Sequence, residues 1–447
     1  MPQFHPAGLI GVVVLIALAW SISEDRSRFP YKLVVAGVLV QFGLAALLLR
    51  VPPVVMGFEA IGYWINAAIM TADEGSRFVF GSLADPGGPA GFVFATRVLP
   101  VIIFFASFMA VLYHLGVMQR IIAVLAWMLR ATLGVTGTEA VAMAANVFVG
   151  QTEAPLCVRP YIPRMTRSQL ATLMVGGFAT IAGSVFAAYV TMLGGDAPPA
   201  GGQADPAQVA ARVEFIKHLI TASVLSAPAA FVMAKILVPE RSTPVDEGLR
   251  SAGTDKPTAN VLDAAAAGAT DGLRLALNVG AMLIAFVALL ALVNLLLGGL
   301  GRVGLPRDAL DALGIESLRL EVIMGWLLAP LAWAMGVPWE ESPFFGMLLG
   351  EKLVVTEFIA YSHLAADVQL SRQGLPHNLS PRSAYIAAYA LCGFANFPSI
   401  AIQIGGLTAL APGRRSEFAS LGLRAMAGGA MASWMTASVA GVLLTAH

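Results

Sequence analysis

The sequence contains few charged residues. Only 12% of its 447 residues are Asp, Glu, Lys or Arg, whereas about a quarter of the residues of a typical soluble domain are charged. Hydrophobic residues make up 57% of the chain, and its mean hydropathy is +0.77. This composition excludes a soluble globular protein and predicts an integral membrane protein.

Cysteine is scarce, and neither sign of charge is in excess. The two cysteines, Cys157 and Cys392, lie in apolar or motif-bearing segments, so the chain has no disulfide framework or thiolate metal site. The 27 basic residues balance 27 acidic ones, which gives no indication of a nucleic-acid partner. The sequence also lacks a metalloprotease H-E-x-x-H, a Walker loop and a facing Ser/His pair. We therefore do not expect an enzyme.

Long apolar stretches are abundant. Several have about the 20 residues needed to cross a hydrocarbon core of about 30 Å. They are residues 7–23, 33–52, 98–118, 169–194, 216–238 and 271–299. The first lacks a preceding basic region and a small-residue cleavage site, so we interpret it as a retained span rather than a signal peptide. Segment 56–81 is amphipathic, which predicts an interfacial or scaffold helix.

The basic residues predict an orientation. The loop after the first span contains Arg26, Arg28 and Lys32, whereas loop 195–210 has no Lys or Arg. Because cytoplasmic loops are enriched in Lys and Arg, the first loop is expected in the cytoplasm and the second outside.

The chain contains a duplicated unit. Each copy begins with a moderately hydrophobic helix, continues into an apolar segment interrupted by a polar cluster, and then passes through Arg-Ser into a similar helix. The landmarks of the first copy are 121–135, GQTEAP at 150–155 and RSQLATLMVGGFAT at 167–180; those of the second are 322–337, GEKLVVTEF at 350–358 and RSAYIAAYALCGFAN at 382–396. This order predicts an internal repeat, with 239–270 joining the halves.

The polar clusters predict two re-entrant hairpins. Gly150 and Pro155 disfavour a continuous helix through the first cluster. Non-helical backbone at membrane depth is tolerated only where protein or a water-filled cavity surrounds it. Broken segments at matching places in two halves point to the midplane binding site of a transporter.

Two carboxylates within the predicted spans are functional candidates, because ionisable groups are costly there. Glu153 follows Gln151 and Thr152, and Glu357 follows Thr356. The alternative is a structural ion pair, and we expect such a pair between the neighbouring Glu351 and Lys352.

Two Gly-rich segments, 177–185 and 393–406, predict broken helices. Pro398 removes a backbone donor and should open the second helix just after Asn396. This leaves Asn396 and Ser399 able to hydrogen-bond a ligand.

A cation site is also predicted. The side-chain oxygens of Asn146 and Thr180, with carbonyls exposed by breaks near Val149 and Ile181, suit a hard ion such as sodium.

These motifs together resemble one family. GQTEAPL at 150–156 with NVFVG before it, GEK and EFIAY within 350–361, and GFAN with SIAIQIGG within 393–406 are similar to the concentrative nucleoside transporters, bacterial branch. The likeness covers nearly the whole chain. It implies an all-α polytopic protein of the inner membrane with about eight transmembrane helices, discontinuous helices and two re-entrant helical hairpins in an inverted repeat. It also implies a homotrimer in the lipid bilayer.

The resemblance implies site residues as well. The base would contact Gln151, Thr152, Glu153 and Val185, and the ribose would contact Glu357, Asn396 and Ser399, with Phe394 beside the sugar. Sodium would lie at Asn146, Val149, Thr180 and Ile181. Two residues depart from the family pattern, Thr356 in place of Asn and Pro398 in place of Ser, and both touch the implied substrate pocket.

The implied organisation has four parts. They are N-terminal scaffold spans with an interfacial segment (1–118), the first transport repeat (119–238), a connecting loop with a long scaffold helix (239–315) and the second transport repeat (316–447). The implied function is cation-coupled nucleoside uptake by alternating access, with sodium as the coupling ion and no other cofactor. Proton coupling, a nucleoside channel and a non-transporting receptor are the alternatives.

Overall fold

Helices form the framework of the chain. The computed structural model describes residues 6–85, 93–195, 205–246, 258–304 and 318–444, and these ranges contain helices, turns and connections but no strand. The all-α prediction is therefore confirmed.

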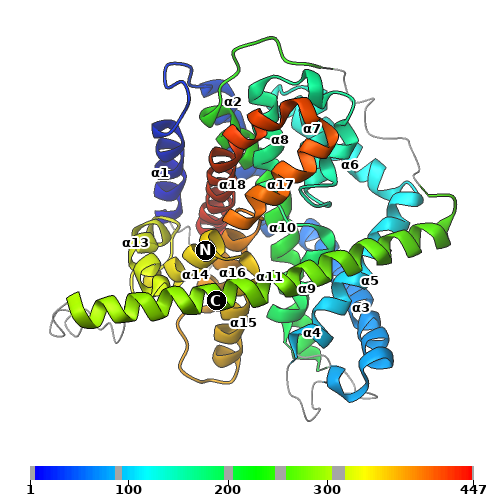
Figure 1. The fold of residues 1–447 in the computed structure, drawn as a ribbon, viewed down its shortest axis with the longest axis vertical. Coiled ribbons are helices and arrows are strands. Elements are labelled where there is room, and N and C mark those ends of the chain that lie inside the picture. Colours follow the sequence, from blue (N-terminus) through cyan, green and yellow to red (C-terminus); the bar gives the residue numbers. More distant parts are fainter. Residues whose placement is uncertain (1–5, 86–92, 196–204, 247–257, 305–317, 445–447) are drawn as a thin grey trace.

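The helices outside the two repeats form one group. They are α1 (Ala7–Ser21), α2 (Tyr31–Arg50), α3 (Pro52–Phe80), η1 (Gly81–Ala84), α4 (Phe94–Arg97), α5 (Leu99–His114) and the long α11 (Val261–Gly304). In Figure 1, α11 crosses the full width of the molecule. Its first turns lie beside α5, where the Ser107 hydroxyl donates a hydrogen bond to the Ala265 carbonyl at 2.9 Å.

The two repeats are built from the same four parts in the same order. The first comprises α6 (Val117–Leu133), α7 (Gly137–Asn146), η2 (Ala154–Val158), η3 (Ile162–Arg164), α8 (Arg167–Ala179), α9 (Gly183–Gly194) and α10 (Pro206–Leu237). The second comprises α13 (Leu320–Ala334), α14 (Ser342–Val354), α15 (Glu357–Arg372), α16 (Pro381–Leu391), α17 (Phe397–Leu410), η5 (Pro412–Arg414) and α18 (Arg415–Leu443). Each therefore has a helix, a hairpin, a broken helix and a long helix.

The two hairpins differ in their second arm. In the second repeat both arms, α14 and α15, are α-helical, whereas α7 of the first repeat is followed by the short 3₁₀ helices η2 and η3. Pro155 and Pro163 lie in these two 3₁₀ helices. Because proline cannot donate the backbone hydrogen bond of a helix interior, they favour short turns over a second α-helical arm.

Seven described helical segments are long and apolar enough to cross a membrane. They are Tyr31–Arg50, Pro52–Ala84, Phe94–His114, Arg167–Gly194, Pro206–Leu237, Val261–Gly299 and Pro412–Leu443. One predicted span, 7–23, is missing from this set because α1 has only 15 residues. The segment 393–406, predicted as a broken helix, is also outside it, since α16 and α17 are separated by a break. The amphipathic α3, expected in the interface or on the scaffold, is within the set by length and composition.

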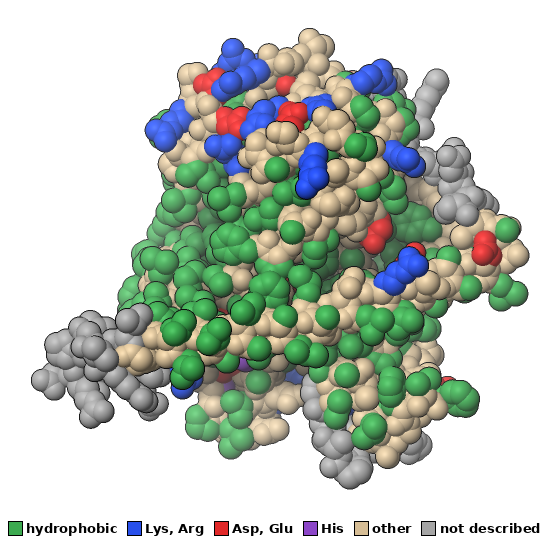
Figure 2. All heavy atoms as spheres, in the orientation of Figure 1, with side chains coloured by type: hydrophobic (Ala, Val, Ile, Leu, Met, Phe, Trp, Pro, Cys, Tyr) green, Lys and Arg blue, Asp and Glu red, His purple; other side chains and the backbone are tan. Residues whose placement is uncertain are grey.

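One end of the molecule carries a charged cap. Lys and Arg side chains gather there with Asp and Glu above a hydrophobic band, as Figure 2 shows. Glu24 accepts hydrogen bonds from Arg167 at 2.7 Å and from Arg424 at 2.6 Å. The hydrogen bond from Arg167 lowers the pKa of the Glu24 carboxyl, with help from the charge of Arg424. This cap contains the loop that the basic residues assign to the cytoplasm.

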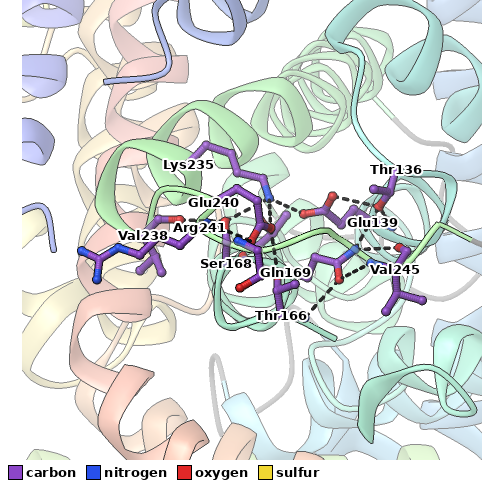
Figure 3. Close-up of polar contacts among 12 residues, drawn as sticks. Thr136, Glu139, Thr166, Ser168, Gln169, Lys235, Val238, Glu240, Arg241 and Val245 are labelled. Carbon is purple, nitrogen blue, oxygen red and sulfur yellow. Dashed lines mark hydrogen bonds and ion pairs between the residues drawn. The ribbon is translucent and has the colours of Figure 1, made fainter. Parts of the chain in front are cut away.

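A buried ion pair lies in the first repeat, at the same end of the molecule as the charged cap (Figure 3). Lys235 Nζ of α10 is 2.6 Å from Glu139 Oε1 of α7, and Glu139 also accepts a hydrogen bond from Thr136, the N-cap of α7. The side chain of Gln169 in α8 bonds both the N–H and the C=O of Val245. The segment that follows α10 is thus fastened to the first repeat.

Candidate functional site

A cavity of about 780 Å³ lies where the hairpin tips, the two helix breaks and α11 meet. Its volume falls within the usual range for a small-molecule site. All eight residues predicted to contact a substrate line it. They are Gln151, Thr152 and Glu153 of the first hairpin, Val185 of α9, Glu357 of α15, and Phe394, Asn396 and Ser399 at the second break.

Glu357 is held by groups from both repeats. It is the first residue of α15 and is only 3% exposed. Its Oε1 accepts a hydrogen bond from the Tyr189 hydroxyl of α9 at 3.0 Å, and its Oε2 accepts one from Asn396 Nδ2 at 2.7 Å. A helix N-terminus favours a carboxylate. Glu357 is therefore a fixed acceptor group at the cavity.

Sequence reasoning did not identify Tyr189. Its ring stacks on Tyr361, with 4.1 Å between the ring centroids, and lies 4.9 Å from Phe358. It supports Glu357 from behind the cavity. A tyrosine within an apolar helix carries no signal that separates this role from simple packing.

The second break brings Asn396 to the cavity. Asn396 is the N-cap of α17, and its Oδ1 accepts a hydrogen bond from the Ser399 N–H at 2.8 Å. Pro398 lies within the first two positions of that helix, where proline is tolerated because the N–H has no helical partner. The predicted break is present but lies at Cys392–Asn396, so its expected position just after Asn396 is wrong: a new helix begins there and holds Pro398 in its first turn.

Gly393 allows the two breaks to touch. Its φ is +110°, and a Cβ atom there would lie 2.5 Å from the carbonyl oxygen of Phe178 at the end of α8. Any larger residue would be strained and would push the breaks apart.

Polar atoms without partners line the cavity from both hairpins. Gln151 Oε1 and Thr356 Oγ1 are buried, and neither has a hydrogen-bond partner within the described part of the chain. Glu153 is exposed to the cavity, and its backbone N–H donates to the Gly150 carbonyl at 3.1 Å. Buried polar groups are normally paired, so these atoms fit a polar ligand.

The predicted cation residues also lie near one another. Asn146 ends α7 and is fully buried, and neither Oδ1 nor Nδ2 has a hydrogen-bond partner among the described residues. Thr180 and Ile181 form the break between α8 and α9. The N–H of Gly183 donates to the Phe148 carbonyl at 2.9 Å, which ties the hairpin turn to this break.

The donor set fits a sodium ion. Asn146 and Thr180 carry neutral side-chain oxygens, and Val149 and Ile181 lie outside the helices, in the hairpin turn and in the break. Thr180 Oγ1 donates its proton to the Gly176 carbonyl at 3.0 Å, so its lone pairs are free to face a cation.

The expected pairing of Glu351 with Lys352 is wrong. Glu351 accepts a hydrogen bond from His363 at 2.8 Å. Lys352 Nζ instead donates to the carbonyls of Ala390 and Cys392 and to the Ser433 hydroxyl, at 2.7–3.1 Å. Consecutive helix residues do not face each other, so the two charges point to different neighbours.

One wall of the cavity was also missed by sequence reasoning. Asp271, Arg274 and Asn278 of α11 line it. A signal was present, because Asp271 and Arg274 are ionisable residues at the start of the predicted span 271–299.

Two broken helices and two hairpins around one cavity are the arrangement typical of the binding site of a membrane transporter. Three family models match the chain. Those described as the Na+ dependent nucleoside transporter N-terminus and C-terminus match residues 10–83 and 218–441, and the one described as nucleoside recognition matches residues 95–196.

Individual relatives agree. An uncharacterized transporter from Haemophilus influenzae is 42% identical, with 98% of this chain and 97% of the relative covered. Sodium/nucleoside cotransporter 1 of Rattus norvegicus is 39% identical over 97% of this chain and 63% of its own length. The solved structure of CNTnw in an inward-facing substrate-bound state is 41% identical, with a TM-score of 0.84 and coverage of 98% and 97%.

The chain belongs to the Na+-dependent nucleoside transporter family. The resemblance in the sequence is therefore confirmed, and so is the expectation of a transporter rather than an enzyme.

Proposed function

We propose that this protein imports nucleosides across the cytoplasmic membrane together with sodium, by alternating access. The observation that carries the proposal is the meeting of all eight predicted substrate residues in one cavity. The partly unpaired oxygens of Asn146 and Thr180, which fit a cation, lie in the hairpin arm and helix break that border this cavity.

The proposed nucleoside pose follows from hydrogen-bonding capacity. Gln151, Thr152 and Glu153 offer an amide, a hydroxyl and a carboxylate to the edge of the base, with Val185 against its apolar face. For the ribose hydroxyls, Glu357 offers an acceptor and Asn396 a donor. These two side chains are already hydrogen-bonded to each other. Phe394 covers the sugar, and Ser399 supplies a further hydroxyl.

Sodium would couple to the nucleoside through the first hairpin. An ion held by Asn146, Val149, Thr180 and Ile181 ties the end of α7 to the break between α8 and α9, and Gln151 to Glu153 follow directly after that point. Ordering this turn raises nucleoside affinity, and by linkage the nucleoside raises sodium affinity equally.

The proposed movement carries the two repeats, 119–238 and 316–447, against a scaffold formed by 1–118 and the helix of 239–315. Support comes from CNTnw, whose solved structures include inward-facing and outward-facing states. One positive charge entering through 100 mV supplies about 2.3 kcal/mol, and about 1.4 kcal/mol corresponds to a tenfold ratio. The potential alone would sustain roughly 50-fold accumulation.

A homotrimer in the inner membrane is part of the proposal. Support comes from α11, whose outer face exposes Leu277, Ile284 and Leu295, an apolar surface that needs lipid or a neighbouring copy. Native mass spectrometry of the purified protein should give a mass close to three chains. A mass of one chain in mild detergent would contradict the trimer.

Uridine uptake by proteoliposomes tests the proposed function. We expect saturable uptake that an inward sodium gradient accelerates and that an inside-negative potential increases further. Equal uptake with and without sodium, but acceleration by acid outside, would establish proton coupling instead. Non-saturable flux would indicate a channel, and binding without flux a receptor.

A further inference from the structure

The wall that α11 contributes to the cavity is part polar and part apolar. Asp271, Arg274 and Asn278 lie three and four residues apart, a spacing that places them along one face of a helix. The other residues of α11 that line the cavity are apolar, and four of the five lie beyond Asn278. They are Leu275, Val279, Ala281, Met282 and Leu283. The polar stripe therefore marks the end of the wall nearer the start of α11.

The packing of α11 fixes where this stripe points. A Cβ atom at Gly268 would lie 2.6 Å from the side chain of Ala110, and one at Gly272 would lie 2.8 Å from the side chain of Ala106 and from Ile103 Cα. Two glycines four residues apart allow such close contact between helices in a membrane. Because this face is held against α5, α11 cannot turn its polar stripe away from the cavity without losing the contact.

The charged groups of the stripe are open to a ligand. Arg274 Nη1 is 3.7 Å from Asp271 Oδ1, and the two side chains are 76% and 75% exposed. An exposed ion pair of this kind is weak. The five N–H donors of arginine and the oxygens of aspartate and asparagine therefore remain free to bond hydroxyl and carbonyl groups.

The other polar residues that line the cavity belong to the two repeats, whereas α11 lies outside them. If the repeats move as proposed, a nucleoside carried by the hairpins passes along α11. It then contacts different residues of α11 at different stages of the movement.

We propose that Asp271, Arg274 and Asn278 form a passage site, where the nucleoside is hydrogen-bonded between the central pocket and the water on the side where α11 begins. This proposal rests on the proposed function. The ligand class is the same, a neutral nucleoside, with Arg274 donating to its carbonyl or hydroxyl oxygens and Asp271 accepting from its hydroxyl or N–H groups. Occupancy of the passage site shortens the distance over which the nucleoside is without polar partners.

Exchange and binding measurements on Asp271→Asn and Arg274→Gln test the passage site. Asp263→Asn, on the same helix, and Arg120→Gln, on α6, serve as matched controls because neither residue lines the cavity. We expect exchange of radiolabelled uridine across proteoliposomes to slow about fivefold in both test variants. Uridine affinity in detergent should stay within twofold of wild type, which also shows that the variants are folded.

Two results would overturn the proposal. Exchange rates equal to those of the control variants would assign Asp271 and Arg274 a solvation role at the membrane boundary. A weakened uridine affinity with an unchanged maximal exchange rate would place them in the central pocket. Failure of the proposed function is distinct from both, because wild type itself would then show no uridine exchange.

Discussion

The hydroxyl of Tyr189 donates a hydrogen bond to Glu357 Oε1 at 3.0 Å and thereby joins the two repeats at the cavity. Tyr189 lies in the second part of the broken helix of the first repeat, and Glu357 begins the second arm of the second hairpin. Because Asn396 occupies the other carboxylate oxygen, the acceptor is oriented before a ligand arrives. Such preorganisation lowers the entropy that binding must overcome.

Replacement of Glu357 tests this acceptor. Glu357→Gln keeps the size of the side chain but removes its charge, and hydrogen bonds to charged groups contribute about 1.5–3 kcal/mol. We expect uridine affinity to fall about 10- to 100-fold. Tyr189→Phe should cause a smaller loss, because the carboxylate stays charged and keeps Asn396. Isothermal titration measures both, and equal losses in the two variants would contradict this ranking.

Glu153 provides a second test of the pocket. Its carboxylate is exposed to the cavity at the first hairpin tip, so Glu153→Gln should weaken uridine binding strongly, about tenfold or more, if an ionised group accepts from the base. Glu340→Gln, an exposed carboxylate outside the cavity, is the control. Wild-type affinity in Glu153→Gln would remove this residue from the site.

The buried Lys235–Glu139 pair should matter for stability rather than for recognition. Lys235→Met leaves Glu139 charged and buried without its ion-pair partner, which typically costs about 3–5 kcal/mol. A second change, Glu139→Gln, should restore much of the loss, because it removes the unpaired charge. Thermal unfolding in detergent measures the effect. A double variant as unstable as the single one would show that the charges are not the cause.

Acid should weaken the charged cap. The pKa of Glu24 is lowered below its ordinary value of 4.5 by its hydrogen bond to Arg167. The folded state thus favours the ionised carboxyl, so its contribution is fully present above about pH 4.5 and is lost as the pH falls through the lowered pKa. Glu24→Gln should lower the unfolding temperature by about 1–3 °C at pH 7, and the difference from wild type should narrow below pH 4.5. A difference that stays constant with pH would contradict this linkage.

Much of the architecture could be predicted from the sequence, because its signals are local. Gly150 and Pro155 interrupt the first hairpin by backbone chemistry alone, Pro398 suits the first turn of the helix that follows the second break, and the order of landmarks repeats in both halves. The sequence did not predict that the second arm of the first hairpin consists of 3₁₀ helices whereas its first arm is α-helical. These 3₁₀ helices depend on how Pro155 and Pro163 fit the surrounding structure.

Long-range contacts account for what was missed. Tyr189 reaches Glu357 across 168 residues, and Asp271 of α11 reaches the cavity only because α11 packs beside α5. The expected pair of Glu351 and Lys352 was wrong because each side chain found a partner from another segment. Proximity in sequence did not predict proximity in space.

The central claim is that a cation at Asn146 and a nucleoside in the cavity stabilise each other. Uridine affinity of the purified protein, measured by titration at increasing sodium with total ionic strength held constant by choline, tests it most directly. We expect affinity to rise about tenfold with sodium and to saturate, as a coupling free energy of about 1–2 kcal/mol requires. Asn146→Ala should abolish or shift that dependence to much higher sodium. Uridine binding that is equally tight with and without sodium in the wild-type protein would contradict the account.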